Sequence, residues 1–119
     1  MLLQRLALRA AVACLMAAST PARAQLVGRA SFYGYESGRV TADGERFDPL
    51  GMTAAHLTLH FGTRARVTDM ATGRSVVVRI NDRGPHPRLH RAIDLSLGAA
   101  QALGITGRGV IAARIDVLR

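Results

Sequence analysis

Alternating apolar and polar positions predict the clearest local structure in this chain. Residues 63–69 alternate along the chain, as a half-buried β-strand does. The polar face consists of Arg64, Arg66 and Thr68, and the apolar face of Ala65 and Val67. Residues 70–73 have the composition of a turn, and the valine-rich residues 74–80 follow. The pattern therefore predicts a β-hairpin over residues 63–80.

Two further strands are predicted, one well before this hairpin and one well after it. Residues 110–118 alternate again and indicate a closing strand, while residues 28–35 are aromatic, bounded by glycine, and indicate a short first strand. Residues 36–51 are rich in Gly, Asp, Ser and Pro, which is typical of an irregular loop. We expect a second irregular stretch from Asn81, which should break the valine-rich strand abruptly, to Ala92.

One short helix is predicted after that stretch. Asp94 or Ser96 can cap its N-terminus, and Gly104 follows Leu103 as a stop signal. The apolar face of the helix would consist of Leu95, Ala99, Ala102 and Leu103. With five or six short strands, one or two short helices and many glycines, the chain is predicted to be mainly β and to form a small closed barrel.

The first 24 residues have the order of a secretory signal peptide. Arg5 and Arg9 precede or flank an apolar run, and residues 21–24 end in small residues that suit a signal peptidase. We expect cleavage after Ala24, which removes 24 of the 119 residues and leaves one domain over residues 25–119. The alternative is a buried N-terminal helix, which the position of the arginines disfavours.

Cys14 is the only cysteine and lies inside the predicted signal. The exported domain would therefore contain no disulfide. Residues 11–14 loosely resemble a lipobox, so lipidation of Cys14 and an outer-membrane anchor remain the alternative to cleavage after Ala24. The apolar run before Cys14 is short for that purpose. Either way, we expect an exported protein of the periplasm or cell envelope.

Every basic residue is arginine, and the chain carries 16 of them against eight acidic residues. Positive charge of this kind attracts polyanions, and for an exported protein these are cell wall or anionic lipid. We expect no nucleic-acid partner, because few aromatic residues are available for base stacking. The alternative is that the arginines simply coat the surface.

Three segments carry polar residues suited to catalysis. Glu45 follows the Asp43-Gly44 turn, His56 stands in a run of small residues that should leave it accessible, and Asp82 ends the valine-rich strand. Each has a structural alternative: Asp82 can be a turn former, Glu45 a solvated surface acid, and His56 a hydrogen-bonded structural histidine.

Other chemistries have weaker support. The four histidines lack a zinc-site spacing and cysteine partners, so we expect neither a metal nor another cofactor. Composition alone does not exclude a Ser-His-Asp triad, but no serine lies in a Gly-x-Ser-x-Gly elbow. Carboxylate acid–base chemistry remains, which is the usual means of breaking a glycosidic bond.

These segments resemble the rare lipoprotein A family of double-psi β-barrel proteins. The resemblance covers nearly all of residues 28–118, in order and without large gaps. The matching elements are Ala30-Ser31-Phe32-Tyr33-Gly34, Thr41-Ala42-Asp43-Gly44-Glu45, Leu50-Gly51-Met52-Thr53-Ala54-Ala55-His56, Phe61-Gly62-Thr63, the run from Val76 to Pro85, and Ile93-Asp94-Leu95-Ser96. The individual motifs are weak, and their ordered combination is strong.

The resemblance implies a six-stranded double-psi β-barrel with lytic transglycosylase activity on peptidoglycan strands that have lost their stem peptides. Asp82 would be the principal catalytic acid, supported by Glu45 and His56. We expect Tyr33, Arg83 and Asp94 to bind the substrate. We also expect the protein to be a monomer. The bond between N-acetylmuramic acid and N-acetylglucosamine would be cleaved without water, giving 1,6-anhydro products.

This mechanism requires Asp82 to hold a proton, so its site should be shielded or lie near Glu45 as a like charge. The nearby arginines at positions 79, 83, 88 and 91 would oppose this unless they point away. The sequence also departs from the family: Phe32, His60 and His86 replace residues usual there, which puts substrate affinity in doubt. Longer members carry a C-terminal peptidoglycan-binding domain, which we do not expect after Arg119.

Two other classes of protein compete with the enzyme. Expansin-like wall-binding modules use a similar barrel and depend on an aspartate in a motif like that of Asp94, although Asp94 as a helix cap would explain it equally well. A barwin-like inhibitor is disfavoured because its disulfide framework is missing.

Overall fold

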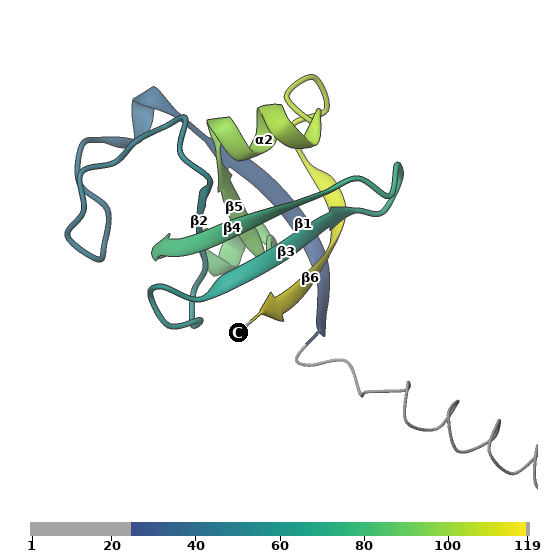
Figure 1. Cartoon of the computed structure of the whole chain (residues 1–119), viewed down its shortest axis with the longest axis horizontal. Helices are drawn as coiled ribbons and strands as arrows, with labels where there is room; N and C mark the ends of the chain where they lie inside the picture. Colours follow the sequence, from purple (N-terminus) through teal and green to yellow (C-terminus); the bar gives the residue numbers. More distant parts are fainter. Residues whose placement is uncertain (1–24, 119) are drawn as a thin grey trace, which may run out of the picture.

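The computed structural model describes residues 25–118, in which six strands close into a barrel (Figure 1). The strands are β1 (Gln25–Tyr33), β2 (Thr53–Ala55), β3 (Arg64–Asp69), β4 (Ser75–Asp82), β5 (Ile93–Ser96) and β6 (Ile111–Leu118). One α-helix, α2 (Leu97–Leu103), and two 3-10 turns, Tyr35–Ser37 and Pro87–Leu89, complete the fold. The predicted signal peptide and Cys14 lie outside the described residues. The mainly β, six-stranded prediction is confirmed.

The order of strands around the barrel is β1-β5-β2-β4-β3-β6. Two pairs are parallel, β1 with β5 and β2 with β4, and the other neighbours are antiparallel. The predicted hairpin is β3 and β4, which pair in register from Arg64 with Arg79 to Thr68 with Ser75. Because the ends of parallel strands meet at the same edge of a sheet, this order brings the end of β2 beside the end of β4.

The interior is filled by the apolar faces that alternation predicted. Ala65 and Val67 of β3 are fully buried, and Ile111, Ala113 and Ile115 of β6 are buried as well. Side chains of a strand alternate between its two faces, so the arginines between these residues lie outside. The remaining core residues come from the other strands, the helix and the segment after it: Ala30, Ala54, Val78, Ile80, Ile93, Leu95, Ala99, Ala100, Leu103 and Ile105.

The helix begins and ends where its signals indicated. The Ser96 hydroxyl accepts the backbone N–H of Ala99, and Gly104 takes the left-handed conformation that ends the helix. Its predicted apolar face was partly wrong, because Ala102 is exposed and Ala100 is buried in its place. No helix among residues 25–118 is long and apolar enough to cross a membrane.

Three boundaries differ from the prediction. β1 begins at Gln25 and ends at Tyr33, so it starts earlier than expected. β4 does not break before Asn81 but runs through Asp82, because this end of the strand still pairs with β2. Asp94 is not a helix cap; it belongs to β5, a strand too short to show a period in the sequence.

The long connection between β1 and β2 is fastened to the helix. The Gly98 N–H donates to the Pro49 carbonyl over 2.8 Å, and the Ser96 hydroxyl donates to the Gly51 carbonyl over 2.5 Å. A Cβ atom on Gly98 would lie 2.2 Å from the Leu50 carbonyl oxygen, so only glycine allows this approach. The connection therefore has a defined position relative to the barrel.

Replacing Gly98 with alanine is expected to destabilise the domain by about 2–3 kcal/mol, because the new methyl group overlaps backbone atoms that have little room to move. Gly107→Ala is the matched control: a Cβ there meets nothing within 4 Å, so a change below about 0.5 kcal/mol is expected. Urea unfolding of both variants measures the difference, and equal stabilities would contradict the close approach.

Candidate functional site

Two carboxylates lie in one row across the barrel wall. Ala55 of β2 pairs with Asp82 of β4 on one side and with Asp94 of β5 on the other, and Asp94 pairs in turn with Ser31 of β1. Neighbouring strands are about 4.8 Å apart, so the backbones of the two aspartates are separated by roughly 10 Å. The small side chain of Ala55 leaves room between them.

A shift in strand register puts Asp82 in this row. Ala54 pairs with Ile80, but the next residue, Ala55, pairs with Asp82, so Asn81 is passed over. Shifts of this kind re-aim a side chain and are frequent next to active sites. Ile80 is fully buried in the core, whereas Asp82 is only partly buried and lies on the outer face.

The Asp82 carboxylate is held by the backbone. Its Oδ1 atom accepts the Ala42 N–H over 3.0 Å and the Arg83 N–H over 2.9 Å. The neighbouring Asp43 N–H donates to the Asn81 carbonyl over 3.2 Å. The loop that contains Glu45 is thus tied to the end of β4, and the second carboxylate oxygen of Asp82 makes no hydrogen bond in the described part of the chain.

Asp94 is the half-buried member of the row. Its Oδ1 atom accepts the Ser31 hydroxyl over 2.9 Å. Burial raises the pKa of Asp94 above its ordinary value, and the negative charges of Glu36 and Asp82 add to this effect. The Ser31 hydrogen bond and the charge of Arg91 oppose it without cancelling it. Asp94 therefore takes up a proton at a higher pH than an ordinary aspartate does.

Tyr33 lies beside both aspartates. Its ring stacks on Phe47 with centroids 5.0 Å apart, and together with Ala55 these residues form a small apolar cluster outside the main core. Burial first, and then the charges of Asp82 and Asp94, raise the pKa of Tyr33. Its buried hydroxyl is near Asp82 but completes no hydrogen bond of good geometry with any described residue. The hydroxyl therefore lies in the buried part of the site, on the side of Asp82.

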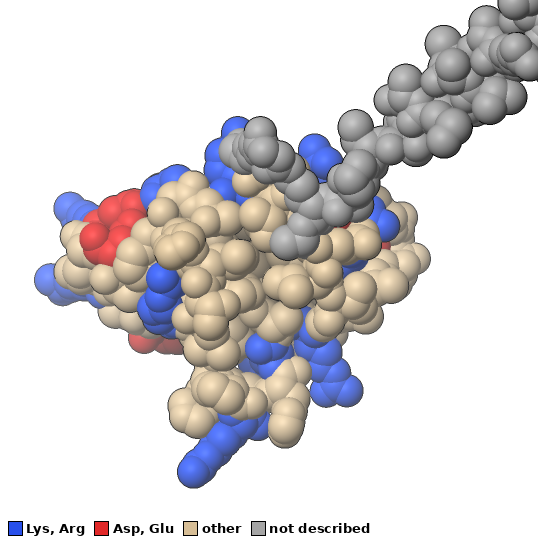
Figure 2. Space-filling view, turned by 90° about the horizontal axis from the view of Figure 1, so that it is seen from below, with Lys and Arg blue, Asp and Glu red and all other residues tan. Residues whose placement is uncertain are grey.

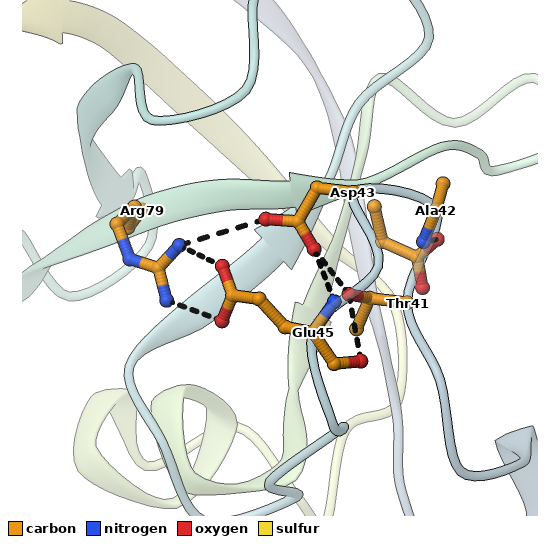
Figure 3. A network of polar contacts seen from close by, with 6 residues as sticks. Thr41, Ala42, Asp43, Glu45 and Arg79 are labelled. Atoms are coloured by element: carbon orange, nitrogen blue, oxygen red, sulfur yellow. Dashed lines mark hydrogen bonds and ion pairs between the residues drawn. The ribbon is translucent and has the colours of Figure 1, made fainter.

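The sequence suggested that Glu45 stands at the edge of its loop, but its carboxylate is not free there. Arg79 of β4 binds its carboxylate through both terminal nitrogens, one of them at 2.8 Å, and also approaches Asp43 at 3.8 Å (Figure 3). Asp43 in turn accepts the Thr41 hydroxyl and the Glu45 N–H. Glu45 therefore neutralises Arg79 and stiffens the loop, and its carboxylate is directed to Arg79 instead of Asp82.

His56 is buried and not accessible, in contrast to the prediction from its small neighbours. It is 8% exposed, and its backbone N–H donates to the Asp82 carbonyl over 3.2 Å. Its Nδ1 atom accepts the N–H groups of Thr58 and Leu59, each over 3.1 Å. Burial and then the charge of Arg83 lower the pKa of His56. Its ring is therefore neutral and holds the chain after β2 in a turn.

Two of the nearby arginines are engaged away from Asp82. The Arg83 guanidinium donates to the carbonyls of His56 and Leu59 and lies 3.8 Å from the centre of the Phe61 ring. Arg79 is bound by Glu45, as described above. Arg83, predicted to bind substrate, thus serves to fix the loop after β2.

The predicted site residues are only partly brought together. One outer face of the barrel contains Asp82, Asp94 and Tyr33, and the His56 backbone lies next to them. The Glu45 carboxylate is directed to Arg79 instead. Ser31 and Ala55 were missed as site residues, because nothing in a sequence shows that two small residues will flank a carboxylate. Among residues 25–118, no three His, Cys, Asp or Glu side chains are grouped as a metal site would need.

Arginines project from several sides of the face shown in Figure 2, and its carboxylates gather mainly at one end. The positive charge is therefore spread over this face and does not form a single patch on it. A distribution of this kind attracts polyanions in general.

The raised pKa of Asp94 predicts the pH dependence of stability. The unfolded chain ionises this group more readily than the folded one, so folding stability should fall as pH rises from about 4 through the raised pKa. The Asp94→Asn variant lacks this loss, and its stability relative to wild type should increase over the same range. Urea unfolding at several pH values measures the difference, and a constant or decreasing difference would contradict the burial of this carboxyl.

The lowered pKa of His56 predicts that its imidazole stays neutral to a lower pH than an ordinary histidine does. Its contribution to stability should be complete above about pH 6.5 and should decline as pH falls through the lowered pKa. Nitrogen-15 NMR above about pH 7 should show an unprotonated Nδ1 and a protonated Nε2. A proton on Nδ1 would exclude the two hydrogen bonds from residues 58 and 59.

Two solved structures, a protease inhibitor and an expansin, have the same architecture as this chain. The Streptomyces papain inhibitor has a TM-score of 0.67 and 21% sequence identity, covering 85% of this chain and 100% of the inhibitor. An expansin of Clavibacter michiganensis has a TM-score of 0.64 and 24% identity, covering 81% of this chain and 51% of the expansin. At these identities the likeness shows the fold, and it confirms a double-psi β-barrel.

Sequence comparison places the chain in a family. A family model described as "Lytic transglycolase" matches residues 25–115. A relative from Nostoc sp., named "Probable endolytic peptidoglycan transglycosylase RlpA", is 61% identical over 99 residues, which are 81% of this chain and 26% of the relative. The chain thus spans about a quarter of the length of that relative. It belongs to the rare lipoprotein A (RlpA) family of double-psi β-barrel proteins.

Proposed function

We propose that this chain is a lytic transglycosylase that cleaves peptidoglycan glycan strands. The observation that carries the proposal is the row of Asp82 and Asp94 on one outer face, with the unpartnered hydroxyl of Tyr33 beside them. Paired carboxyl groups in different environments are the usual apparatus for breaking a glycosidic bond. The family and the name of its Nostoc relative support the same activity.

In the proposed reaction, Asp82 acts first as acid and then as base. Its carboxyl proton passes to the oxygen that links N-acetylmuramic acid to N-acetylglucosamine, and the bond from that oxygen to C1 of the muramic acid breaks. The C6 hydroxyl of the same sugar then bonds to C1 and gives its proton to the Asp82 carboxylate. A 1,6-anhydro ring closes, no water is consumed, and Asp82 is protonated again for the next cycle.

The neighbours of Asp82 have supporting roles in this proposal. Asp94 lies in the same row, and its raised pKa means that it takes up a proton more readily than an ordinary aspartate does. The Tyr33 hydroxyl can donate to the departing oxygen or to Asp82. Glu45 removes the charge of Arg79 from the site, and His56 positions the end of β2 through its backbone and ring. Glu45 and His56 are positioning residues in this scheme.

The substrate would be found outside the cytoplasm. We propose that residues 1–24 export the domain to the periplasm or cell envelope, with cleavage after Ala24 or lipidation of Cys14 as the two forms of processing. The preferred substrate would be strands that lack stem peptides, since their muramic acid side chain is short and the carboxylate row is partly buried.

A second candidate function is binding to wall polysaccharide without cleavage. The observation in its favour is that two of the three expected catalytic groups are engaged: Glu45 by Arg79 and the Nδ1 atom of His56 by two backbone N–H groups. The same face could then bind a sugar chain through Tyr33 and Asp94 alone, as an expansin-like module.

Asp82→Asn is expected to reduce the formation of 1,6-anhydro products by about 10²–10⁴-fold, because an amide can neither give nor take the proton. Residues 25–119 are incubated with amidase-treated peptidoglycan, and products are identified by mass spectrometry. Asp48→Asn, which removes an exposed carboxylate that accepts the Leu50 N–H, should retain activity.

The outcomes separate the two functions. Products from wild type and from Asp48→Asn but not from Asp82→Asn would support the lyase. Glycan binding without products in any of the three proteins would support the binding module. Full activity of Asp82→Asn would exclude Asp82 as the acid.

A further inference from the structure

A hollow with two arginines lies on the connection between β1 and β2. Its volume is about 430 Å³, and it is lined by Tyr35, Gly38, Arg39, Arg46, Phe47 and Pro49. Arg39 and Arg46 belong to the two sides of a small hairpin, in which Val40 bridges to Arg46 and the Phe47 N–H donates to the Arg39 carbonyl over 2.7 Å. The proposed reaction uses none of the residues that line the hollow.

Arg39 and Arg46 differ from the engaged arginines of the chain. Arg79, Arg108 and Arg114 form ion pairs with carboxylates. Within residues 25–118, by contrast, the side chains of Arg39 and Arg46 make no hydrogen bond and no ion pair.

The acidic residues closest in sequence form no ion pair with the two arginines, and the nearest of them, Glu45, is bound by Arg79. The Glu36 carboxylate accepts the Gly34 N–H, and the Asp48 carboxylate accepts the Leu50 N–H, each over 3.0 Å. The two guanidinium groups of the hollow are therefore not paired with a carboxylate of the described residues. Two guanidinium groups suit a carboxylate, which they can bind with parallel hydrogen bonds.

The hollow shares Phe47 with the aromatic pair beside the candidate active site. Phe47 lines it and stacks on Tyr33, whose hydroxyl lies near Asp82. The same loop is tied to Asp82 through the Ala42 N–H. Tyr35 is 71% exposed at the rim and offers an aromatic face to a sugar ring. A glycan strand with its scissile bond at Asp82 would thus extend toward the two arginines.

We propose that this hollow binds the free carboxylate of the lactyl group on a muramic acid residue next to the cleaved bond. The inference rests on the proposed function, since it concerns a strand bound at Asp82. Removal of the stem peptide exposes this carboxylate, whereas an attached peptide converts it into a neutral amide. Arg39 and Arg46 would therefore select strands without stem peptides by charge, in addition to size.

The test compares two forms of one ligand in the Asp82→Asn background, which prevents turnover. The first is a peptide-free glycan fragment, and the second is the same fragment with its lactyl carboxylates converted to methylamides. Calorimetry should show that the acid form binds about tenfold more tightly. With Arg39→Gln and Arg46→Gln together, this ratio should fall close to one, while binding of the amide form stays the same.

Two further variants control for charge and for folding. Arg64→Gln with Arg66→Gln removes the same charge from exposed positions on β3, outside the hollow, and should keep the tenfold ratio. Arg39→Lys with Arg46→Lys keeps the charge without the planar guanidinium, and should retain part of the preference. Thermal unfolding of each variant confirms that the loop substitutions leave the barrel intact.

The results distinguish this inference from the proposed function. Equal binding of the two ligands by the parent chain, or an equal loss of preference in both glutamine pairs, would overturn the carboxylate subsite. A preference that depends on Arg39 and Arg46 supports it. If wild type forms no 1,6-anhydro products while this preference persists, the lyase is wrong and the subsite stands as part of a binding module.

Discussion

The register shift between β2 and β4 is the constraint on which the candidate site depends. Ala54 lies between Ile80 and Leu95, both fully buried, so its row faces the core. Without a shift, the following row would contain Asn81; with it, that row contains Asp82 and Asp94. The shift leaves the Oδ1 atom of Asn81 buried and unpaired among the described residues, a local cost that accompanies the re-aimed carboxylate.

The loop between β1 and β2 connects this row to the rest of the proposed substrate path. It is tied to Asp82 by the Ala42 N–H, to Asn81 by the Asp43 N–H, and to the helix by the contact between Pro49 and Gly98. Phe47 of this loop is itself buried against Tyr33 and Ala55. Because the loop is anchored at both ends, the hollow and the carboxylates keep a defined relation to each other.

The arginines of this chain have different surroundings, which a count of charged residues does not distinguish. Arg79 is neutralised by Glu45, and Arg83 supports the turn after β2, so neither is free to act on Asp82. Arg39 and Arg46 have no such partners in the described residues and carry their charge into a hollow. A net positive charge is therefore compatible both with a site that needs a protonated carboxyl and with affinity for an anionic strand.

The sequence by itself determined the elements with a clear period or a capping signal: the hairpin of β3 and β4, the closing strand β6, and the helix that begins after Ser96 and ends at Gly104. The order of its motifs also predicted the family and the barrel fold. Only the tertiary structure decided which carboxylates meet. Asp94 and Asp82 are brought into one row by pairing with a three-residue strand whose register no periodicity reveals. Glu45 is bound by Arg79, which is distant in the chain, and the His56 ring accepts two backbone N–H groups. The sequence did not reveal these contacts, because ion pairing and burial depend on where the chain returns in space and not on local composition.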